Sequence, residues 1–144
     1  MASELTLQRK LIEETNRLGG YAQKLSNRFL VGVPDLLLHL PGLPTAFIEC
    51  KLEVLPARPT TPIKINLSPQ QRAVLKKMQA ADMVAGWCVF VANKSGSNPD
   101  WYWILYGRDT NVTELRQGCL AGFETRKRGE PWPVKTIIRN LTCS

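Results

Sequence analysis

Three charged residues stand inside the two apolar runs of GVPDLLLHLPGLPTAFIECK, residues 32–51. Asp35 opens the first run, and Glu49 and Lys51 close the second. Burying charges without partners is costly, so this placement needs a reason. Two carboxylates and an ammonium group suit a divalent cation such as Mg²⁺, which binds oxygen ligands and keeps positions for water and phosphate. The lysine can then orient an attacking water or stabilise charge on the phosphate.

Strand geometry predicts that two of these residues share one face of a sheet. The turn PGLPT separates the two runs, so they predict a hairpin. Side chains alternate along a strand, which puts Phe47, Glu49 and Lys51 on one face. Asp35 begins the neighbouring strand and can reach the same region. The alternative is a cross-strand salt bridge between Lys51 and a carboxylate, and geometry alone leaves both interpretations open.

Helical spacing and cap signals predict two helices around this hairpin. Ser3 is the expected N-cap of the first, in which Leu7, Leu11 and Leu18 form an apolar stripe. The second opens with SPQQ, in which a serine cap, a proline and a glutamine form a capping box. The predicted helices and strands cover residues 3–18 and 68–82 (helices) and 21–25, 35–40, 46–54, 86–93 and 101–107 (strands).

The element order is therefore α-β-β-β-α-β-β. It predicts one α/β domain over residues 1–144, with a mixed central β-sheet flanked by helices. A long proline-rich loop at 53–67 holds no regular element, residues 94–100 form a polar turn, and residues 112–118 form a short helix. Residues 110–144 are predicted to form a basic C-terminal extension without a clear helix or strand pattern.

Five stretches of the chain, in this order, resemble one family of nucleases. Pro34-Asp35 and Glu49-Cys50-Lys51 resemble the PD-(D/E)xK nuclease motif, and the chain more narrowly resembles the virus-type replication–repair nuclease family, VRR-NUC. The stretches are SELTLQRKLIE, LGGYAQKL, GVPDLLL, AFIECK and LSPQQRAVLKKMQAAD, within residues 3–92. The resemblance implies a restriction-endonuclease-like core and a divalent-metal-dependent nuclease.

The resemblance also implies a site. Asp35, Glu49 and the backbone carbonyl of Cys50 would bind the metal, Lys51 would be the catalytic lysine, and Gln71 would join them. A glutamine in a capping box needs no further role, so both interpretations of Gln71 stay open. The first helix offers three alternative further ligands, namely Glu4, Gln8 and Glu14. Mg²⁺ is the expected cofactor, and Mn²⁺ is expected to substitute for it.

The net charge is +7, and the excess lies in residues 53–82 and 110–144. A basic surface favours a polyanion, most often nucleic acid, although charge can also serve solubility alone. Basic residues beside Trp132 suit phosphate contacts with base stacking, and the alternative is a solvated surface over a core tryptophan. The candidate nucleic-acid contacts are Lys24, Arg58, Lys64, Arg72, Lys76, Arg126, Lys127 and Arg128.

Other classes of protein are disfavoured by simple observations. No apolar run is long enough for a membrane span, and the charged N-terminus is not a signal peptide, so a cytoplasmic protein is expected. Four cysteines without a CxxC pair argue against a zinc cluster. His39 is the single histidine, which makes a serine or cysteine hydrolase improbable.

The expected function is a structure-selective endonuclease acting on branched or flapped DNA in phage or bacterial replication, recombination or repair. RNA remains an alternative substrate. A chain with one site needs a homodimer to cut two strands. The alternative class is a non-catalytic module that binds nucleic acid or protein on a nuclease fold.

Overall fold

A mixed α/β architecture organises the chain in a computed structural model, which describes residues 3–25, 31–92, 102–122, 124–126 and 129–142. In chain order the elements are α1 (Glu4–Arg17), β1 (Tyr21–Lys24), β2 (Leu36–His39), β3 (Ala46–Val54), β4 (Ile63–Lys64), α2 (Pro69–Ala80), β5 (Val84–Ala92), β6 (Tyr102–Gly107), β7 (Glu114–Leu115), the 3₁₀ helix η1 (Gln117–Gly122), β8 (Glu124–Arg126) and α3 (Val134–Thr142).

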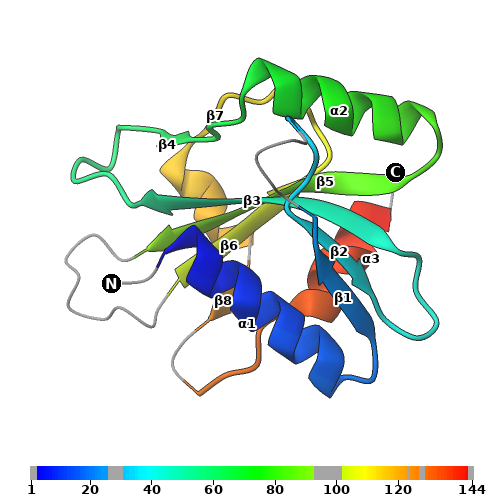
Figure 1. The fold of residues 1–144 in the computed structure, drawn as a ribbon. Coiled ribbons are helices and arrows are strands. Elements are labelled where there is room, and N and C mark those ends of the chain that lie inside the picture. The colour runs from blue at the N-terminus through cyan, green and yellow to red at the C-terminus, as the bar shows by residue number, and fades with distance from the viewer. Residues whose placement is uncertain (1–2, 26–30, 93–101, 123, 127–128, 143–144) are drawn as a thin grey trace.

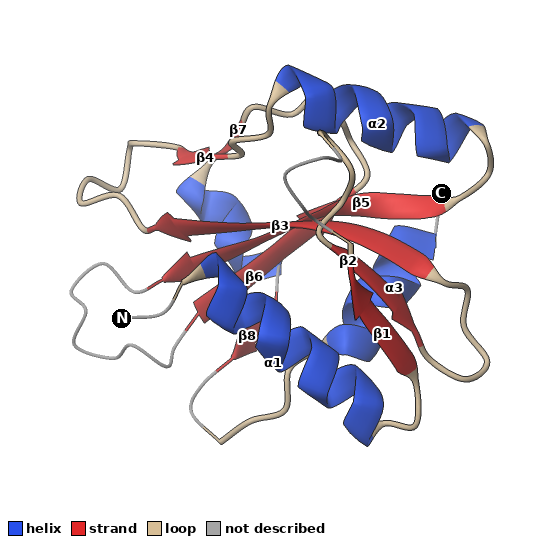
Figure 2. Cartoon of the chain, viewed as in Figure 1, coloured by secondary structure: helices blue, strands red, loops and turns tan. Residues whose placement is uncertain are grey.

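The central sheet has six strands in the order β1-β2-β3-β5-β6-β8 (Figure 2). β3 and β5 run parallel, and the other neighbours are antiparallel. The parallel pair requires a crossover, and α2 supplies it. A separate two-stranded sheet joins β4 to β7. The predicted fold class, a mixed central sheet flanked by helices, is confirmed.

Helices cover both faces of the sheet and give two hydrophobic cores (Figure 1). α1 and α3 pack on one face, where Leu7, Leu11 and Ile137 meet Ile48 and Phe90. On the other face, Leu75 of α2 and side chains around β4 and η1 cover Val89 and its neighbours. Leu18 was expected in the α1 stripe, but it lies past the end of the helix and is 39% exposed.

The hairpin predicted around PGLPT is present, but its two strands differ in length. β2 pairs with β3 over three positions, ending at Leu36 opposite Ile48. β5 pairs with β3 over nine positions, from Ala46 to Val54. Residues 49–54 of β3 therefore have β5 on one side, and no described strand pairs with their other edge. This uncovered edge is the place where Asp35 lies.

Three sequence expectations for the chain beyond residue 52 were wrong. The loop at 53–67 contains β4, and residues 112–118 contain β7 and only the first residues of the 3₁₀ helix η1, not a helix of their own. β4 and β7 stabilise each other by pairing across about 50 residues, which a local pattern does not reveal. The weakly patterned end contains β8 and the amphipathic helix α3, whose buried residues are Val134, Ile137, Ile138 and Leu141.

Trp132 belongs to the core. It is 8% exposed, and its ring contacts those of Phe90 and Tyr102. The guanidinium of Arg126 lies 4.3 Å from its ring centroid. The interpretation of Trp132 as a core residue is therefore confirmed. The expected turn at 94–100 lies outside the described residues, and no described helix is long and apolar enough to span a membrane.

Candidate active site

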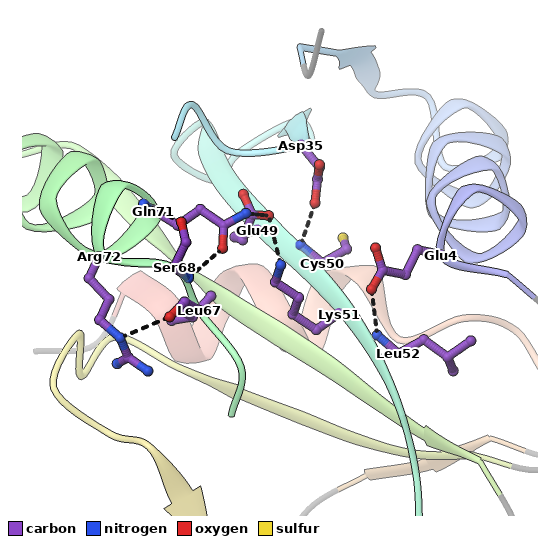
Figure 3. A network of polar contacts seen from close by, with 10 residues as sticks. All are labelled: Glu4, Asp35, Glu49, Cys50, Lys51, Leu52, Leu67, Ser68, Gln71 and Arg72. Atoms are coloured by element: carbon purple, nitrogen blue, oxygen red, sulfur yellow. Dashed lines mark hydrogen bonds and ion pairs between the residues drawn. The ribbon is translucent and has the colours of Figure 1, made fainter. Parts of the chain in front are cut away.

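Two carboxylates lie along the uncovered edge of β3 (Figure 3). The backbone N–H of Cys50 donates to Asp35 Oδ2 at 2.8 Å, and that of Leu52 donates to Glu4 Oε1 at 3.3 Å. Alternate residues of a strand direct their N–H groups to the same edge. Asp35, just before β2, and Glu4, at the start of α1, therefore take the acceptor positions that a neighbouring strand would otherwise fill.

Glu49 is the buried carboxylate of the site. It is 2% exposed and faces α2, where its Oε1 accepts a hydrogen bond from Gln71 Nε2 at 2.8 Å. Lys51 Nζ lies 3.9 Å from the same oxygen, so the predicted shared face is confirmed (Figure 3). Glu49 Oε2 is buried and has no hydrogen-bond partner among the described residues. A buried carboxylate oxygen without a partner is costly.

The surroundings of Glu49 disfavour its charged form. Burial, followed by the nearby Asp35 carboxylate, raises the pKa of Glu49 from 4.5 to about 9. Lys51 lowers this pKa, but it does not offset the two larger effects. Like charges brought together in this way raise a carboxyl pKa, and a bound cation would reverse that effect.

Gln71 makes two sets of side-chain hydrogen bonds, one within the capping box and one with Glu49. Its Oε1 accepts from the backbone N–H of Ser68 at 2.9 Å, while the Ser68 hydroxyl accepts from the backbone N–H of Gln71 at 3.1 Å, which completes the capping box. Its Nε2 donates to Glu49. One amide therefore fixes the first turn of α2 and orients the buried carboxylate.

These groups fit a divalent cation. Glu49 Oε2 lacks a partner, Asp35 is close enough to raise the Glu49 pKa, and Cys50 directs its carbonyl to the same strand edge as its N–H. Among the described residues, no three side chains of His, Cys, Asp or Glu form a complete metal cluster. Such a partial set suits Mg²⁺, which usually keeps several waters and binds substrate phosphate.

The structure distinguishes between the three candidate metal ligands on α1. Glu4 lies beside the site through Leu52. The prediction of Glu14 as a metal ligand was wrong, because both of its oxygens are held by Arg17. Ten residues also separate Glu14 from Glu4, about 15 Å along the helix. Gln8 is buried beside Arg9 and Lys24, in a cavity whose described lining includes no acidic residue, so it is a poor cation ligand.

Arg72 was predicted to contact nucleic acid, but its guanidinium binds the protein itself. It donates to the backbone carbonyls of Leu67, Thr110, Val112 and Ile65 at 2.5–3.2 Å. These bonds join the start of α2 to the segments around β4 and β7, so Arg72 is withdrawn from the nucleic-acid set.

The other candidate contacts are distributed around the molecule. Lys24, Arg58, Lys64 and Lys76 have exposed side chains. Arg126 covers Trp132. Lys127 and Arg128 lie outside the described residues. The role of these residues in binding nucleic acid stays a prediction.

Two features near the site escaped sequence reasoning. Gly32 adopts φ +83°, and a Cβ there would lie 2.7 Å from the backbone oxygen of Gln70, so the GVPD loop packs directly against α2. Glu53 follows Glu49 and Lys51 on the same face, and burial and Glu4 raise its pKa. Strand alternation could have identified Glu53.

Comparison with known proteins assigns no family to the chain. No family model matches the chain, and no curated protein matches its sequence. The resemblance to VRR-NUC therefore stays a prediction. Among solved structures, the chain is similar to Hjc, a Holliday junction resolvase from the archaeal hyperthermophile Archaeoglobus fulgidus, with 13% identity over 81% of this chain and 89% of that one, at a TM-score of 0.49. So weak a likeness leaves the function to be judged from the site's own residues.

Proposed function

We propose that this chain is a divalent-metal-dependent nuclease of the PD-(D/E)xK type that hydrolyses phosphodiester bonds in DNA. The observation that carries the proposal is the buried Glu49, whose Oε2 has no partner among the described residues although Asp35 and Lys51 lie beside it. A purely structural salt bridge would pair Lys51 closely with a carboxylate. Here the nearest carboxylate oxygen among the described residues, Glu49 Oε1, is 3.9 Å from Lys51 Nζ.

Each residue of the site would have a separate role in the reaction. Glu49, Asp35 and the Cys50 carbonyl would hold Mg²⁺, with Mn²⁺ as a substitute, and Glu4 stands close enough to contribute through water. When bound, the cation supplies positive charge that polarises the phosphodiester and makes water a better nucleophile. Lys51, 18% exposed at its side chain, stabilises charge on the phosphate or orients the attacking water. Gln71 fixes the rotamer of Glu49.

The finer proposal is that the chain is a structure-selective endonuclease of the VRR-NUC family that acts on branched or flapped DNA. It would work in the cytoplasm, in phage or bacterial replication, recombination or repair. The net charge of +7 and the exposed Lys24, Lys64 and Lys76 support a polyanionic partner. Cleavage of both strands at a junction requires two sites, so we propose a symmetric homodimer. Light scattering should give twice the chain mass, and a monomer on DNA would contradict this part.

The central experiment measures cleavage with Mg²⁺ or Mn²⁺ on linear, flapped, four-way-junction and single-stranded DNA and on matched RNA. The wild-type protein should cut at least one branched DNA, and chelation should stop the reaction. Glu49→Ala should abolish cleavage because it removes the central carboxylate of the site.

The matched control is Glu13→Ala, which removes a carboxylate from the exposed surface of α1. It should cut at the wild-type rate. Cutting by Glu49→Ala at that rate, or binding of every substrate without cleavage, would overturn the proposal. The second outcome would favour the non-catalytic binding module.

A further inference from the structure

A cavity lies beside α1, the helix that carries Glu4. It encloses about 270 Å³ between one face of α1 and the end of β1. Its lining combines two apolar side chains, an amide and two cations, namely Leu5, Ile12, Gln8, Arg9 and Lys24. Apolar walls with a few polar groups are typical of sites for small organic ligands.

Gln8 provides the neutral hydrogen-bonding group of this cavity. The residue is 4% exposed, and its Oε1 is buried without a hydrogen-bond partner among the residues that the structure describes. A buried amide without partners costs stability unless a ligand provides them. Because Oε1 is closed to solvent, the amide must turn into the cavity to reach a ligand. Once turned, it both donates and accepts, so it can pair with a group that presents a donor beside an acceptor. The edge of adenine is such a group.

The charge of the cavity selects an anion. Arg9 and Lys24 contribute positive charge, and none of the described lining residues is acidic. A metal ion would be repelled there, whereas a phosphate group would be attracted. The apolar side chains of Leu5 and Ile12 in turn suit a base or a sugar. The lining therefore matches a nucleotide, with its phosphate on the cations and its base edge on Gln8.

The cavity adjoins the proposed active site. Gln8 lies four residues after Glu4 on α1, about 6 Å along the helix axis, so the two share one helix face. Glu4 accepts from Leu52 at the β3 edge. Lys24 pairs with Leu36, the residue that follows Asp35, and Leu25 N donates to Asp35 O at 2.7 Å. A strand of DNA bound at the carboxylates would thus pass beside the cavity.

We propose that this cavity binds an unpaired nucleotide of the DNA substrate, next to the phosphate that is cut. The inference rests on the proposed function and deepens it, because it explains how a chain of this size selects branched DNA. A base must leave the helical stack to reach such a pocket, and it does so most readily where pairing is already interrupted.

The test measures equilibrium binding in EDTA, so that no cleavage occurs. The probes are a fully paired duplex, the same duplex with one unpaired adenine, and deoxyadenosine monophosphate. The wild-type protein should bind the bulged duplex roughly tenfold more tightly than the paired one, as a bidentate amide–base pair predicts. The free nucleotide should bind far more weakly than either duplex, because it lacks the flanking phosphates.

The variant Gln8→Met removes the amide and keeps an unbranched side chain of similar length. It should lose the preference for the bulge, keep its affinity for the paired duplex, and melt at the same temperature as the wild-type protein or higher. Lys24→Met should weaken binding to both duplexes and lower the salt dependence by about one ion. The matched control Lys10→Met removes an exposed lysine that faces a different pocket, and it should keep the preference.

Three results would overturn the inference. They are an unchanged preference in Gln8→Met, a wild-type protein that does not distinguish the duplexes, and tight binding of the free nucleotide without a preference between duplexes. Each leaves the proposed nuclease intact, because cleavage that depends on Glu49 is measured separately. Conversely, if the protein cut no substrate but its preference for the bulged duplex depended on Gln8, the pocket would be supported and the proposed nuclease activity would be rejected.

Discussion

Glu14 and Glu49 each have a basic residue two or three positions later in the sequence, Arg17 and Lys51. The environments of the two glutamates have opposite effects on their pKa values. Both oxygens of Glu14 are held by Arg17, which lowers the pKa of Glu14. Glu49 lies 3.9 Å from Lys51, shares its surroundings with other carboxylates, and has its pKa raised to about 9. The sequence spacing is similar, so the spacing does not decide which pair is structural. What decides is whether the carboxylate's own oxygens are satisfied.

The largest expected difference between the two pairs is in catalysis. Glu49→Gln keeps the size of the side chain but removes the negative charge that Glu49 would carry with Mg²⁺ bound, and cleavage should fall by about a thousandfold or more. Glu14→Gln should cleave at the wild-type rate. Initial rates on the best branched substrate, at saturating Mg²⁺, measure both. Equal losses in the two variants would erase the distinction between them.

The next largest effect is on the free energy of unfolding, which should decrease as the pH rises. The Glu49 carboxyl keeps its proton in the folded protein up to a pH of about 9, whereas the unfolded chain releases it near 4.5. Without metal, stability should therefore fall as the pH rises from about 5 to about 9. Glu49→Gln removes this loss, so it should be more stable than the wild-type protein by about 3 kcal/mol at pH 7.

Denaturant unfolding in EDTA across that pH range measures the difference, and Mg²⁺ should reduce it by stabilising the wild-type protein. The pKa of Glu14 is lowered instead. Its contribution is present at neutral pH and is lost on acidification through the lowered pKa, the reverse dependence. A Glu49→Gln advantage that stays constant with pH would contradict the assignment of a raised pKa.

Lys51 and Arg17 provide the third contrast. Lys51→Met should slow cleavage about a hundredfold, because it removes the positive charge beside the reacting phosphate. Arg17→Met should leave the rate unchanged. If Lys51→Met cut normally, Lys51 would be only the partner of Glu49 in an ion pair. Single-turnover rates are the suitable readout, because they exclude effects on product release.

The smallest effect belongs to the Glu14 pair. Arg17 is largely exposed, so breaking the pair with Glu14→Gln should lower the melting temperature only slightly. Added salt should shrink this difference, since the exposed guanidinium of Arg17 lets salt screen the pair. A large loss of stability, insensitive to salt, would mean that the burial of Glu14, which is 8% exposed, governs the pair.

Local patterns predicted the parts of the site that depend on local geometry. Strand alternation placed Glu49 and Lys51 on one face, and the SPQQ cap signal placed Gln71 in the first turn of α2. Helical spacing did not separate Glu4 from Glu14, because the choice depends on where α1 crosses β3. The partners of Arg72 lie up to 40 residues away, beyond any local signal.

The missed helix α3 has a different cause. Its buried residues Val134, Ile137, Ile138 and Leu141 follow helical spacing, and Pro133 directly precedes them. This signal was present in the sequence, but the prolines and basic residues just before it suggested an irregular extension. β4 and β8, in contrast, are two and three residues long. Strands this short exist only through their partners.

The uncovered edge of β3 has a consequence for solubility. An exposed strand edge with free N–H groups is a template for pairing with another chain. Asp35 and Glu4 occupy the N–H groups of Cys50 and Leu52 with carboxylates, which cannot continue a sheet. The residues proposed to bind the metal therefore also shield the chain from edge-to-edge association. A variant that lacks both carboxylates would be an inactive protein with an open edge, prone to form fibrous or amorphous aggregates.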